Sequence, residues 1–394
     1  MKAAGVIVEF NPLHHGHIEH LRETTRITQR DYTIAVMSGN FVQRGEPAIC
    51  DKWRRTRMAL LAGVDIVIEL PVSYVVSGAD YFARAGVKLL AATGVVDMLC
   101  FGSESGDLAA MKKAGRVLAY EPVEYKAALK DALHKGMSFA AARGAALAAV
   151  LGDVPTGLLD KPNNGLGMEY CKALWQMGWP MEVFTSFRKA GGPSATAIRK
   201  AILGSNGAVA GIDEMAAFMP SYVIEIMEDA FRSKEIAELD DYSDIFRYLL
   251  FTKGADMGEG LENRFRHLAY KYNRLTALLG AVKTKRYTYT RIQRAALGVI
   301  LGICKADMAA YEEAGGPAYI RVLGFRRRAA NLLGEMTSRA TLPVVTYGKA
   351  MDKLEGFAAS MLAKEFEVGD IYRLAFSGTP DYRHERSMPL IIER

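Results

Sequence analysis

The chain has 394 residues, half of them hydrophobic, and a formal net charge of +6. This length suffices for about two to three domains, and the mild positive charge permits a polyanionic partner without requiring one. The cysteines, Cys50, Cys100, Cys171 and Cys304, lack C-x-x-C spacing, which argues against a zinc ribbon or a disulfide framework and fits a reducing cytoplasm. The chain starts without a basic and apolar leader and has no bilayer-length apolar run, so we expect neither export nor membrane insertion.

Residues 5–17 are the first stretch with a chemical pattern, and they are predicted to form a buried strand, a turn and a helix start. The run Ala4 to Val8 is small and β-branched, as in a central parallel strand, and the Asn-Pro that follows breaks it. His14 and His17 then lie three residues apart at a helix N-terminus. Free N–H groups and imidazole donors there suit a phosphate, although a His-rich surface turn or an incidental metal site is an alternative.

Buried strands and helices are predicted to alternate in the segments that follow. The strands are Tyr32 to Met37, Ile66 to Leu70 and Met98 to Phe101, and the helices are Ile18 to Thr28, Asp51 to Ala62 and Tyr81 to Ala92. This order implies a parallel sheet whose ligands bind at the loops after the strands. Arg44, in one such loop, is either a ligand contact or a solvated residue. The next helix carries Lys52, Arg54, Arg55 and Arg57, for which a solvated face is the simple interpretation.

Residues 160–170 combine one proline, two asparagines and two glycines directly ahead of an apolar helix, Tyr170 to Met177. The amides of Asn163 and Asn164 could read a base edge or a ribose. Asn-Gly is also a common turn and capping choice, and we favour the turn interpretation. The preceding residues, 108–151, are alanine-rich and predicted to be helical.

A second anion-binding helix start is predicted after the strand Met181 to Phe184. Ser194 is a good N-cap for the helix Ala197 to Leu203, and Arg199 lies one turn in. The arginine fork matches two phosphate oxygens. Ser-x-Thr at a helix start can be capping chemistry alone, but two such starts at the ends of one α/β unit favour a phosphate site.

The residues at these two helix starts resemble the (T/H)-x-G-H and S-x-T-x-I-R pair of the nucleotidylyltransferase superfamily, which transfers NMP from a nucleoside triphosphate. More narrowly, the chain resembles the bacterial tRNA(Met) cytidine acetate ligase family. This resemblance rests on residues 10–17, 39–48, 63–72, 101–104, 162–164 and 285–294. It therefore covers most of the chain.

The resemblance implies that ATP and acetate give acetyl-adenylate and pyrophosphate, and that the acetyl group passes to N4 of the wobble cytidine of elongator tRNA(Met). It implies catalytic roles for His14, His17 and Arg199, and a divalent metal, expected to be Mg²⁺, on the phosphates with no metal-ligating residues of the protein. The implied ATP contacts are Ile7, Val8, Glu9, Phe10, Asn11, Pro12, Leu13, His14, His15, Gly16, His17, Ile18, Glu19, His20, Gly102, Asn163 or Asn164, Arg188, Ser194, Thr196 and Arg199. One departure is that the segment between Arg188 and Ser194 lacks the His-Asp pair typical of the family.

The fold class expected is α/β, with a Rossmann-like parallel-sheet nucleotidylyltransferase domain over residues 1–204 and a mostly α-helical domain over residues 205–394. The second half carries clusters of basic residues with tyrosines between them. Basic groups neutralise phosphates and tyrosines stack on unpaired bases, so we favour a tRNA interface over a solvated face. The candidate tRNA contacts are Lys285, Arg286, Tyr287, Tyr289, Arg291 and Arg294, followed by Arg321 and Arg326 to Arg328.

Two other functions stay open from the sequence. One is a nucleotidylyltransferase that adenylylates a small metabolite. The other is an RNA-binding protein that has kept the fold and lost catalysis, against which the intact His14, His17, Ser194, Thr196 and Arg199 argue. The sequence does not determine the oligomeric state.

Overall fold

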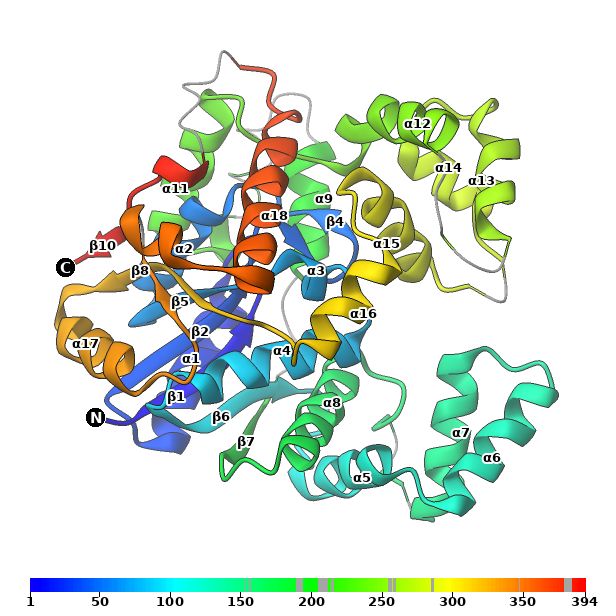
Figure 1. The fold of residues 1–394 in the computed structure, drawn as a ribbon, viewed down its shortest axis with the longest axis horizontal. Coiled ribbons are helices and arrows are strands. Elements are labelled where there is room, and N and C mark those ends of the chain that lie inside the picture. Colours follow the sequence, from blue (N-terminus) through cyan, green and yellow to red (C-terminus); the bar gives the residue numbers. More distant parts are fainter. Residues whose placement is uncertain are drawn as a thin grey trace.

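The computed structural model describes residues 1–152, 154–155, 157–188, 194–204, 212, 214, 216–253, 257, 260–284, 287–346, 348–378 and 385–394. Among these residues one large sheet runs through the molecule, with helices on both faces (Figure 1). The sheet strands are β1 (Ala3–Val8), β2 (Tyr32–Ser38), β5 (Ile66–Leu70), β6 (Val96–Ser103), β7 (Glu182–Phe187), β8 (Ile320–Arg326), β9 (Val344–Val345) and β10 (Ile391–Glu393), and a small hairpin comprises β3 (Phe41–Val42) and β4 (Glu46–Pro47).

The helices fall into those that follow the strands of the first half and those of the second half. The first group is α1 (His15–Thr28), α2 (Lys52–Leu61), α3 (Val72–Val75), α4 (Ala79–Ala92), α5 (Leu108–Tyr120), α6 (Val123–His134), α7 (Phe139–Leu151), α8 (Pro162–Met177) and α9 (Ala195–Gly204). The second is α11 (Ser221–Arg232), α12 (Ser243–Thr252), α13 (Leu261–Ala269), α14 (Leu275–Val282), α15 (Tyr289–Ile300), α16 (Lys305–Glu313), α17 (Ala330–Arg339) and α18 (Gly356–Arg373), with short 3-10 turns between them.

The strand order is β10-β8-β5-β2-β1-β6-β7, so β1 lies inside the sheet between β2 and β6. β1 is parallel to β2 and β6, and these are parallel to β5 and β7 respectively. From β1 the chain proceeds outward on both sides, to β2 and β5 on one side and to β6 and β7 on the other. In doubly wound sheets, ligands bind where the strand order reverses in this way, beyond the carboxyl ends of the strands. The predicted parallel sheet is confirmed, and its reversal lies between β1 and β6.

Alternate residues of the central strands face two separate cores. In β2, Ile34 and Val36 pack with α4, α5 and α8, whereas Ala35 and Met37 pack with α1, α2, α9 and α11. All four are fully buried. Strands covered on both faces need apolar residues at every position, which is why these segments read as continuous apolar runs.

The second half of the chain returns to the sheet. β8 pairs antiparallel with β5, and β10 and β9 pair parallel with β8. β8 was not predicted, because Arg321 interrupts the apolar run of Ile320–Arg326, whereas the sequence of Asp370 to Ile392 is typical of mixed strand and loop, and β10 lies at its end. The sheet thus extends beyond the expected boundary at residue 204, and the division of the chain into a catalytic and a tRNA-binding part remains a prediction about function.

Two predicted boundaries differ from the structure. Pro162 is the first residue of α8, which therefore includes Asn163 and Asn164 instead of starting at Tyr170. Proline is tolerated at this position because its missing N–H has no helical partner there. In the second half, the sequence also predicts one helix over Ala216 to Glu235, but the structure breaks this segment at Pro220, which is the N-cap of α11.

Two groups of helices project from the sheet layers. The helices α12, α13 and α14 lie together on one side of the molecule, and α6 and α7 form a separate hairpin (Figure 1). None of the described helices combines the length and apolar character needed to cross a bilayer. The four cysteines are all free thiols.

Candidate functional site

His14 and His17 begin α1 as a reciprocal cap. The Nδ1 of His14 accepts a hydrogen bond from the Gly16 N–H at 3.1 Å, and the Nδ1 of His17 accepts one from the His14 N–H at 3.3 Å. The two rings stack with centroids 3.8 Å apart, and Phe10 meets His17 edge-on at 5.1 Å. The predicted helix start is confirmed, and the imidazoles are part of its geometry.

This cap determines which nitrogen carries the proton. An Nδ1 that accepts a hydrogen bond leaves the proton of a neutral imidazole on Nε2. Burial, assisted by the charge of Arg188, lowers the pKa of His14 to about 4 and holds the pKa of His17 well below its usual range. Both rings are therefore neutral at pH 7 and present an Nε2–H donor.

Arg188, at the end of β7, lies close enough to depress the pKa of three histidines. The third is His20, whose pKa burial lowers to about 4 and whose Nδ1 is 2.7 Å from the Ser186 hydroxyl. A Cβ on Gly102 would lie 3.2 Å from the Arg188 side chain. The structure thus brings the predicted residues of β6, β7 and α1 together at the reversal point of the sheet.

The remaining residues of the 7–20 segment differ in burial. Val8, Asn11, Pro12 and Leu13 are buried with Phe10; Ile7, Glu9 and Ile18 are partly buried; His15, Gly16 and Glu19 are exposed. The Glu9 carboxylate accepts hydrogen bonds from the Gln43 N–H at 2.7 Å and the Ser38 hydroxyl at 3.1 Å, and burial raises its pKa. Asn11 accepts a hydrogen bond from the Ile49 N–H at 2.8 Å. These polar contacts tie the end of β1 to the loop after β2.

Arg55 is a residue of this site that the sequence analysis assigned to a solvated face. It is fully buried in α2 and donates to the carbonyls of Glu9 at 2.7 Å, Ser38 at 3.1 Å and Cys50 at 3.2 Å, and also to Gly39. One guanidinium therefore joins the carboxyl ends of β1 and β2 to the start of α2. A signal was present, since a helix with an N-cap aspartate and four cations directly after a site loop is unusual for a purely solvated face.

The two asparagines have different roles. Asn164 is buried, and its Oδ1 accepts hydrogen bonds from the N–H groups of Glu104 at 3.0 Å and Ser105 at 3.1 Å, while its Nδ2 donates to the Gly157 carbonyl. Asn163 is partly exposed and donates to the Glu104 carboxylate at 2.6 Å. Asn164 organises the loop after β6, which leaves Asn163 as the better placed for a ligand.

The second predicted helix start reaches the first through Arg199. Ser194 accepts a hydrogen bond from the Ala197 N–H at 3.2 Å, as its N-cap role requires. The buried Arg199 guanidinium donates to the Asn11 carbonyl at 2.7 Å and pairs with Glu46, and Arg44 donates to the Thr196 hydroxyl at 3.1 Å. Burial lowers the pKa of Arg199, which Glu46 opposes.

The predicted tRNA contacts are distributed unevenly. Lys285 and Arg286 lie outside the described residues. Arg291 is exposed, but Tyr287 is only 8% exposed, with the Arg291 guanidinium 5.1 Å from its ring centroid. Arg294 turns inward and donates to the Gln43 carbonyl at 3.3 Å, and Tyr289 is partly buried.

Lys52 was expected on a solvated helix face and Arg321 in a tRNA interface, and both expectations are wrong, because both side chains are buried. The Lys52 Nζ lies 2.5 Å from carboxylate oxygens of both Glu69 and Glu385, and Arg321 contacts the same two carboxylates at 2.8 and 3.2 Å. All four side chains are about 1% exposed. Arg328 is half exposed, and its guanidinium pairs with the buried Asp65 at 2.6 Å. Their charges are satisfied by residues distant in sequence.

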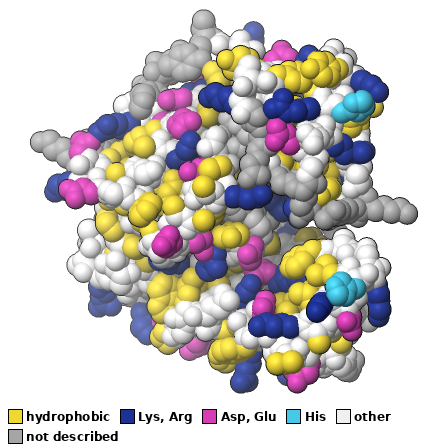
Figure 2. Space-filling model, turned by 45° about the vertical axis from the view of Figure 1, so that its right-hand side comes forward, with side chains coloured by type: hydrophobic (Ala, Val, Ile, Leu, Met, Phe, Trp, Pro, Cys, Tyr) yellow, Lys and Arg dark blue, Asp and Glu magenta, His cyan; other side chains and the backbone are white. Residues whose placement is uncertain are grey.

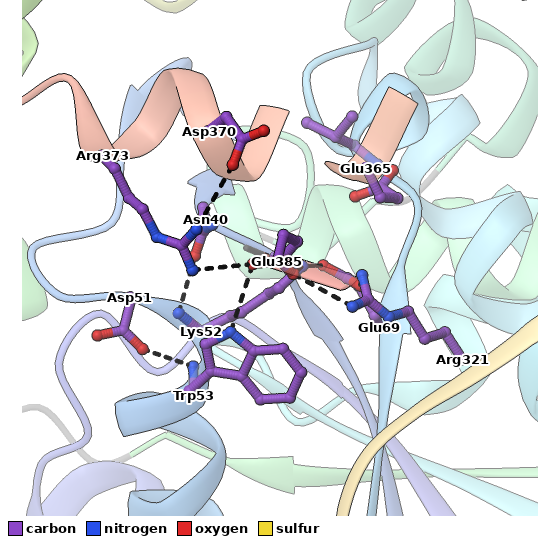
Figure 3. Close-up of polar contacts among 12 residues, drawn as sticks. Asn40, Asp51, Lys52, Trp53, Glu69, Arg321, Glu365, Asp370, Arg373 and Glu385 are labelled. Carbon is purple, nitrogen blue, oxygen red and sulfur yellow. Dashed lines mark hydrogen bonds and ion pairs between the residues drawn. The ribbon is translucent and has the colours of Figure 1, made fainter. Parts of the chain in front are cut away.

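Figure 3 shows Glu385 at the centre of this buried ion cluster, with Lys52, Arg321 and Arg373 directed towards it. Burial would raise the pKa of Glu385, but Lys52 and Arg321 outweigh it and lower that pKa. The nearby Glu365 accepts a hydrogen bond from the Val72 N–H at 2.6 Å, and burial with the charge of Glu69 raises its pKa to about 8. The cluster connects α2 and β5 of the first half to β8, α18 and the C-terminal segment.

In the described part of the chain, no three histidine, cysteine, aspartate or glutamate side chains are grouped to hold a metal ion. Mg²⁺ usually binds proteins through one or two carboxylates together with the phosphates of its substrate. The site is therefore compatible with a metal carried by a nucleotide.

The fold and the site define a nucleotidyltransferase of the HIGH type: the HIGH Nucleotidyl Transferase family matches residues 1–387. Proteins named tRNA(Met) cytidine acetate ligase are 41% identical over 394 residues in Caldanaerobacter subterraneus subsp. tengcongensis, covering 95% of this chain and 96% of that protein, and 36% identical in Clostridium kluyveri, covering all of both. The chain belongs to the tRNA(Met) cytidine acetate ligase family.

A solved structure gives the same result. The crystal structure of Thermotoga maritima TmcAL bound with alpha-thio ATP superposes with a TM-score of 0.92 at 33% identity, over the whole of both chains. The resemblance inferred from the sequence is thereby confirmed.

Proposed function

We propose that this protein activates acetate with ATP and transfers the acetyl group to N4 of the wobble cytidine of elongator tRNA(Met), forming N4-acetylcytidine. In the first step, an acetate oxygen attacks the α-phosphorus and the bond to the β-phosphate oxygen breaks, releasing pyrophosphate. In the second, the cytidine amine attacks the acetyl carbonyl, AMP leaves and the amine loses a proton. The names of the relatives and the geometry of the α1 start support this assignment.

The observation that carries the proposal is the His14 and His17 cap at the N-terminus of α1. Two neutral Nε2–H donors at a helix N-terminus supply hydrogen bonds where negative charge builds up on the leaving pyrophosphate, and the helix dipole favours that charge. Such groups need no proton transfer, since attack at the α-phosphorus depends mainly on positioning and charge neutralisation. Arg188 and Arg199 add positive charge on either side of this start.

The other ATP contacts follow from position. Gly16 and Gly102 let His14 and Arg188 lie close to the backbone of the site, because a Cβ on either glycine would lie about 3 Å from these side chains. Asn163, Ser194 and Thr196 present polar groups at the starts of α8 and α9. Mg²⁺ would enter with ATP as part of the substrate and neutralise phosphate charge.

An ATP–pyrophosphate exchange assay with and without acetate tests the first step. Exchange that depends on acetate supports the proposal. Exchange that depends on another acid instead favours the adenylylation of a small metabolite, and no exchange with any acid favours a non-catalytic RNA-binding protein.

Analysis of elongator tRNA(Met) nucleosides after incubation with ATP and acetate tests the second step. Absence of N4-acetylcytidine would contradict the ligase assignment even if exchange occurs. Among the sequence-predicted tRNA contacts that the structure describes, Arg291 is exposed and accessible to a phosphate.

A further inference from the structure

Helices α12 and α13 carry an exposed aromatic face. Tyr248 is 64% exposed, Phe251 36% and Tyr270 78%. The rings of Phe251 and Tyr270 stack with centroids 4.9 Å apart and planes 28° apart. Single exposed aromatic residues are common on protein surfaces. Here Tyr248 and the stacked pair of Phe251 and Tyr270 together form an exposed aromatic surface, which we call the platform.

The core behind this platform holds it in place. Tyr248 and Phe251 are three residues apart and therefore share one face of α12. The opposite face buries Phe246, which packs edge-on against Phe265 of α13 at 5.3 Å. This contact fixes α12 against α13 and brings Tyr270, at the end of α13, beside Phe251. Packing between α12 and α13 therefore brings the aromatic side chains of the platform together.

The surroundings of the platform are basic. Residues 243–284 contain seven lysines and arginines against four aspartates and glutamates. Arg247 and Arg266 pair with acidic neighbours at 3.5 and 2.9 Å, while Lys253 and Lys271 are exposed next to the aromatic residues. Figure 2 shows hydrophobic and basic side chains side by side on the lobes that face the viewer.

The other projecting lobe, the α6–α7 hairpin, provides a contrast. Residues 121–151 carry four lysines and arginines against three acidic residues, and Phe139 is 61% exposed. That hairpin therefore has exposed apolar groups with almost no net charge. Aromatic faces combined with positive charge are what single-stranded nucleic acids bind, because every base has a stacking face and every linkage a phosphate.

A continuous set of contacts links the platform to the nucleotide site. The hairpin β3–β4 touches α9 through Arg44 and Glu46. The same hairpin packs on α15, because a Cβ on Gly45 would fall 2.6 Å from the Arg294 nitrogen. In turn α15 packs against α12 and α14.

We propose that Tyr248, Phe251 and Tyr270 form the surface on which unpaired nucleotides of the tRNA stack. This inference rests on the proposed function for the identity of the RNA. It places the main base-stacking contacts on α12 and α13 rather than at the buried Tyr287.

The test measures the affinity of the full-length protein, without ATP, for elongator tRNA(Met) transcript, for its isolated anticodon hairpin and for a blunt RNA duplex. The double variant Tyr248→Ala/Tyr270→Ala is expected to bind the tRNA and the hairpin about tenfold more weakly, since base stacking on an aromatic residue is worth that much or more. Duplex binding is expected to change less than twofold. Tyr270→Phe keeps the ring and should bind like the wild type.

Phe139→Ala is the matched control, because it removes an equally exposed ring from the near-neutral hairpin. Equal tRNA affinities of the double variant and this control would overturn the proposal. The proposal would also be overturned if the wild type is a dimer, the double variant is a monomer, and both bind tRNA equally well. The platform would then be a contact between copies of the chain.

Acetate-dependent exchange separates this proposal from the proposed function. The double variant should retain the wild-type exchange rate, since it contributes nothing to the phosphate site. If the wild type shows no exchange but the double variant still loses hairpin affinity, the platform assignment holds and the ligase assignment fails.

Discussion

The polar groups at the start of α1 and those of the buried ion cluster both lie towards the carboxyl ends of central strands, yet they differ in how they are satisfied. In the cluster, Lys52 and Arg321 are enclosed by the carboxylates of Glu69 and Glu385, and all four are about 1% exposed. At the α1 start, His14 and His17 use Nδ1 for the protein and keep Nε2–H as a donor.

This difference shows how the same fold separates structure from binding. A buried cation that is fully paired with protein carboxylates holds two segments together and has no capacity left for a ligand. A group that is positioned by one atom and presents another to a ligand is ready to bind without reorganisation. Residue type alone does not distinguish the two, since both regions are rich in basic side chains.

The largest expected effect comes from breaking the ion cluster. Arg321→Met should lower the free energy of unfolding by ~3–5 kcal/mol, because it leaves part of the charge on Glu69 and Glu385 buried without a partner. Urea unfolding measures this loss. The control is Arg57→Ala, which removes a 58% exposed partner of Glu393 and should cost less than ~1 kcal/mol. Similar losses for both variants would contradict a structural role for the cluster.

The next effect concerns the α1 start. His17→Ala should reduce acetate-dependent exchange by about 10²–10³-fold, since it removes a donor to the leaving pyrophosphate, while tRNA affinity stays unchanged. His134, which is exposed at the end of α6, supplies the control, and His134→Ala should exchange within a few-fold of the wild type. A tRNA-binding defect in His17→Ala with normal exchange would reverse the assignment of the two regions.

Substitution of Arg55 tests whether this fully buried cation supports ATP binding by positioning the backbone around the site. Arg55→Lys keeps the charge but cannot reach several carbonyls in a fork, so the KM for ATP should rise about tenfold and stability should fall by ~1–3 kcal/mol. Steady-state exchange kinetics and urea unfolding report the two effects. If stability falls but the KM for ATP does not change, Arg55 supports the fold and not the site.

The smallest expected effect is a loss of stability at acidic pH. The folded-state pKa of His20 is about 4, below the ordinary 6.5, so the unfolded chain takes up the proton first as pH falls. Its contribution to stability is complete above pH 6.5 and is lost towards pH 4, amounting to about 2 kcal/mol between pH 7 and 5. Between pH 7 and 5, the unfolding free energy of His20→Gln should fall by about 2 kcal/mol less than that of the wild type. Parallel pH profiles of unfolding free energy for the two proteins would show that His20 is not held neutral.

The ion cluster also shows where sequence reasoning fails. Arg321 interrupts an apolar run, so Ile320–Arg326 was interpreted as part of a basic surface, although it forms a strand of the main sheet. Lys52 and Arg55 were assigned to a solvated helix face because four cations lie close together in that helix. Glu385 lies more than 300 residues from Lys52, and the Glu9 carbonyl lies 46 residues from Arg55. No local pattern in the sequence indicates such partners.

The sequence by itself determined the parallel α/β core of the first half, the helix start at His14 and His17 and the family. These features depend on local periodicity, proline and capping chemistry and short motifs, which act over a few residues. Only the tertiary structure decided that β8 and β10 complete the sheet, that Arg55 joins the carboxyl ends of β1 and β2, and that Tyr248, Phe251 and Tyr270 form one surface. The physical reason is that charge pairing, carbonyl satisfaction and surface exposure depend on which distant segments the folded chain brings into contact.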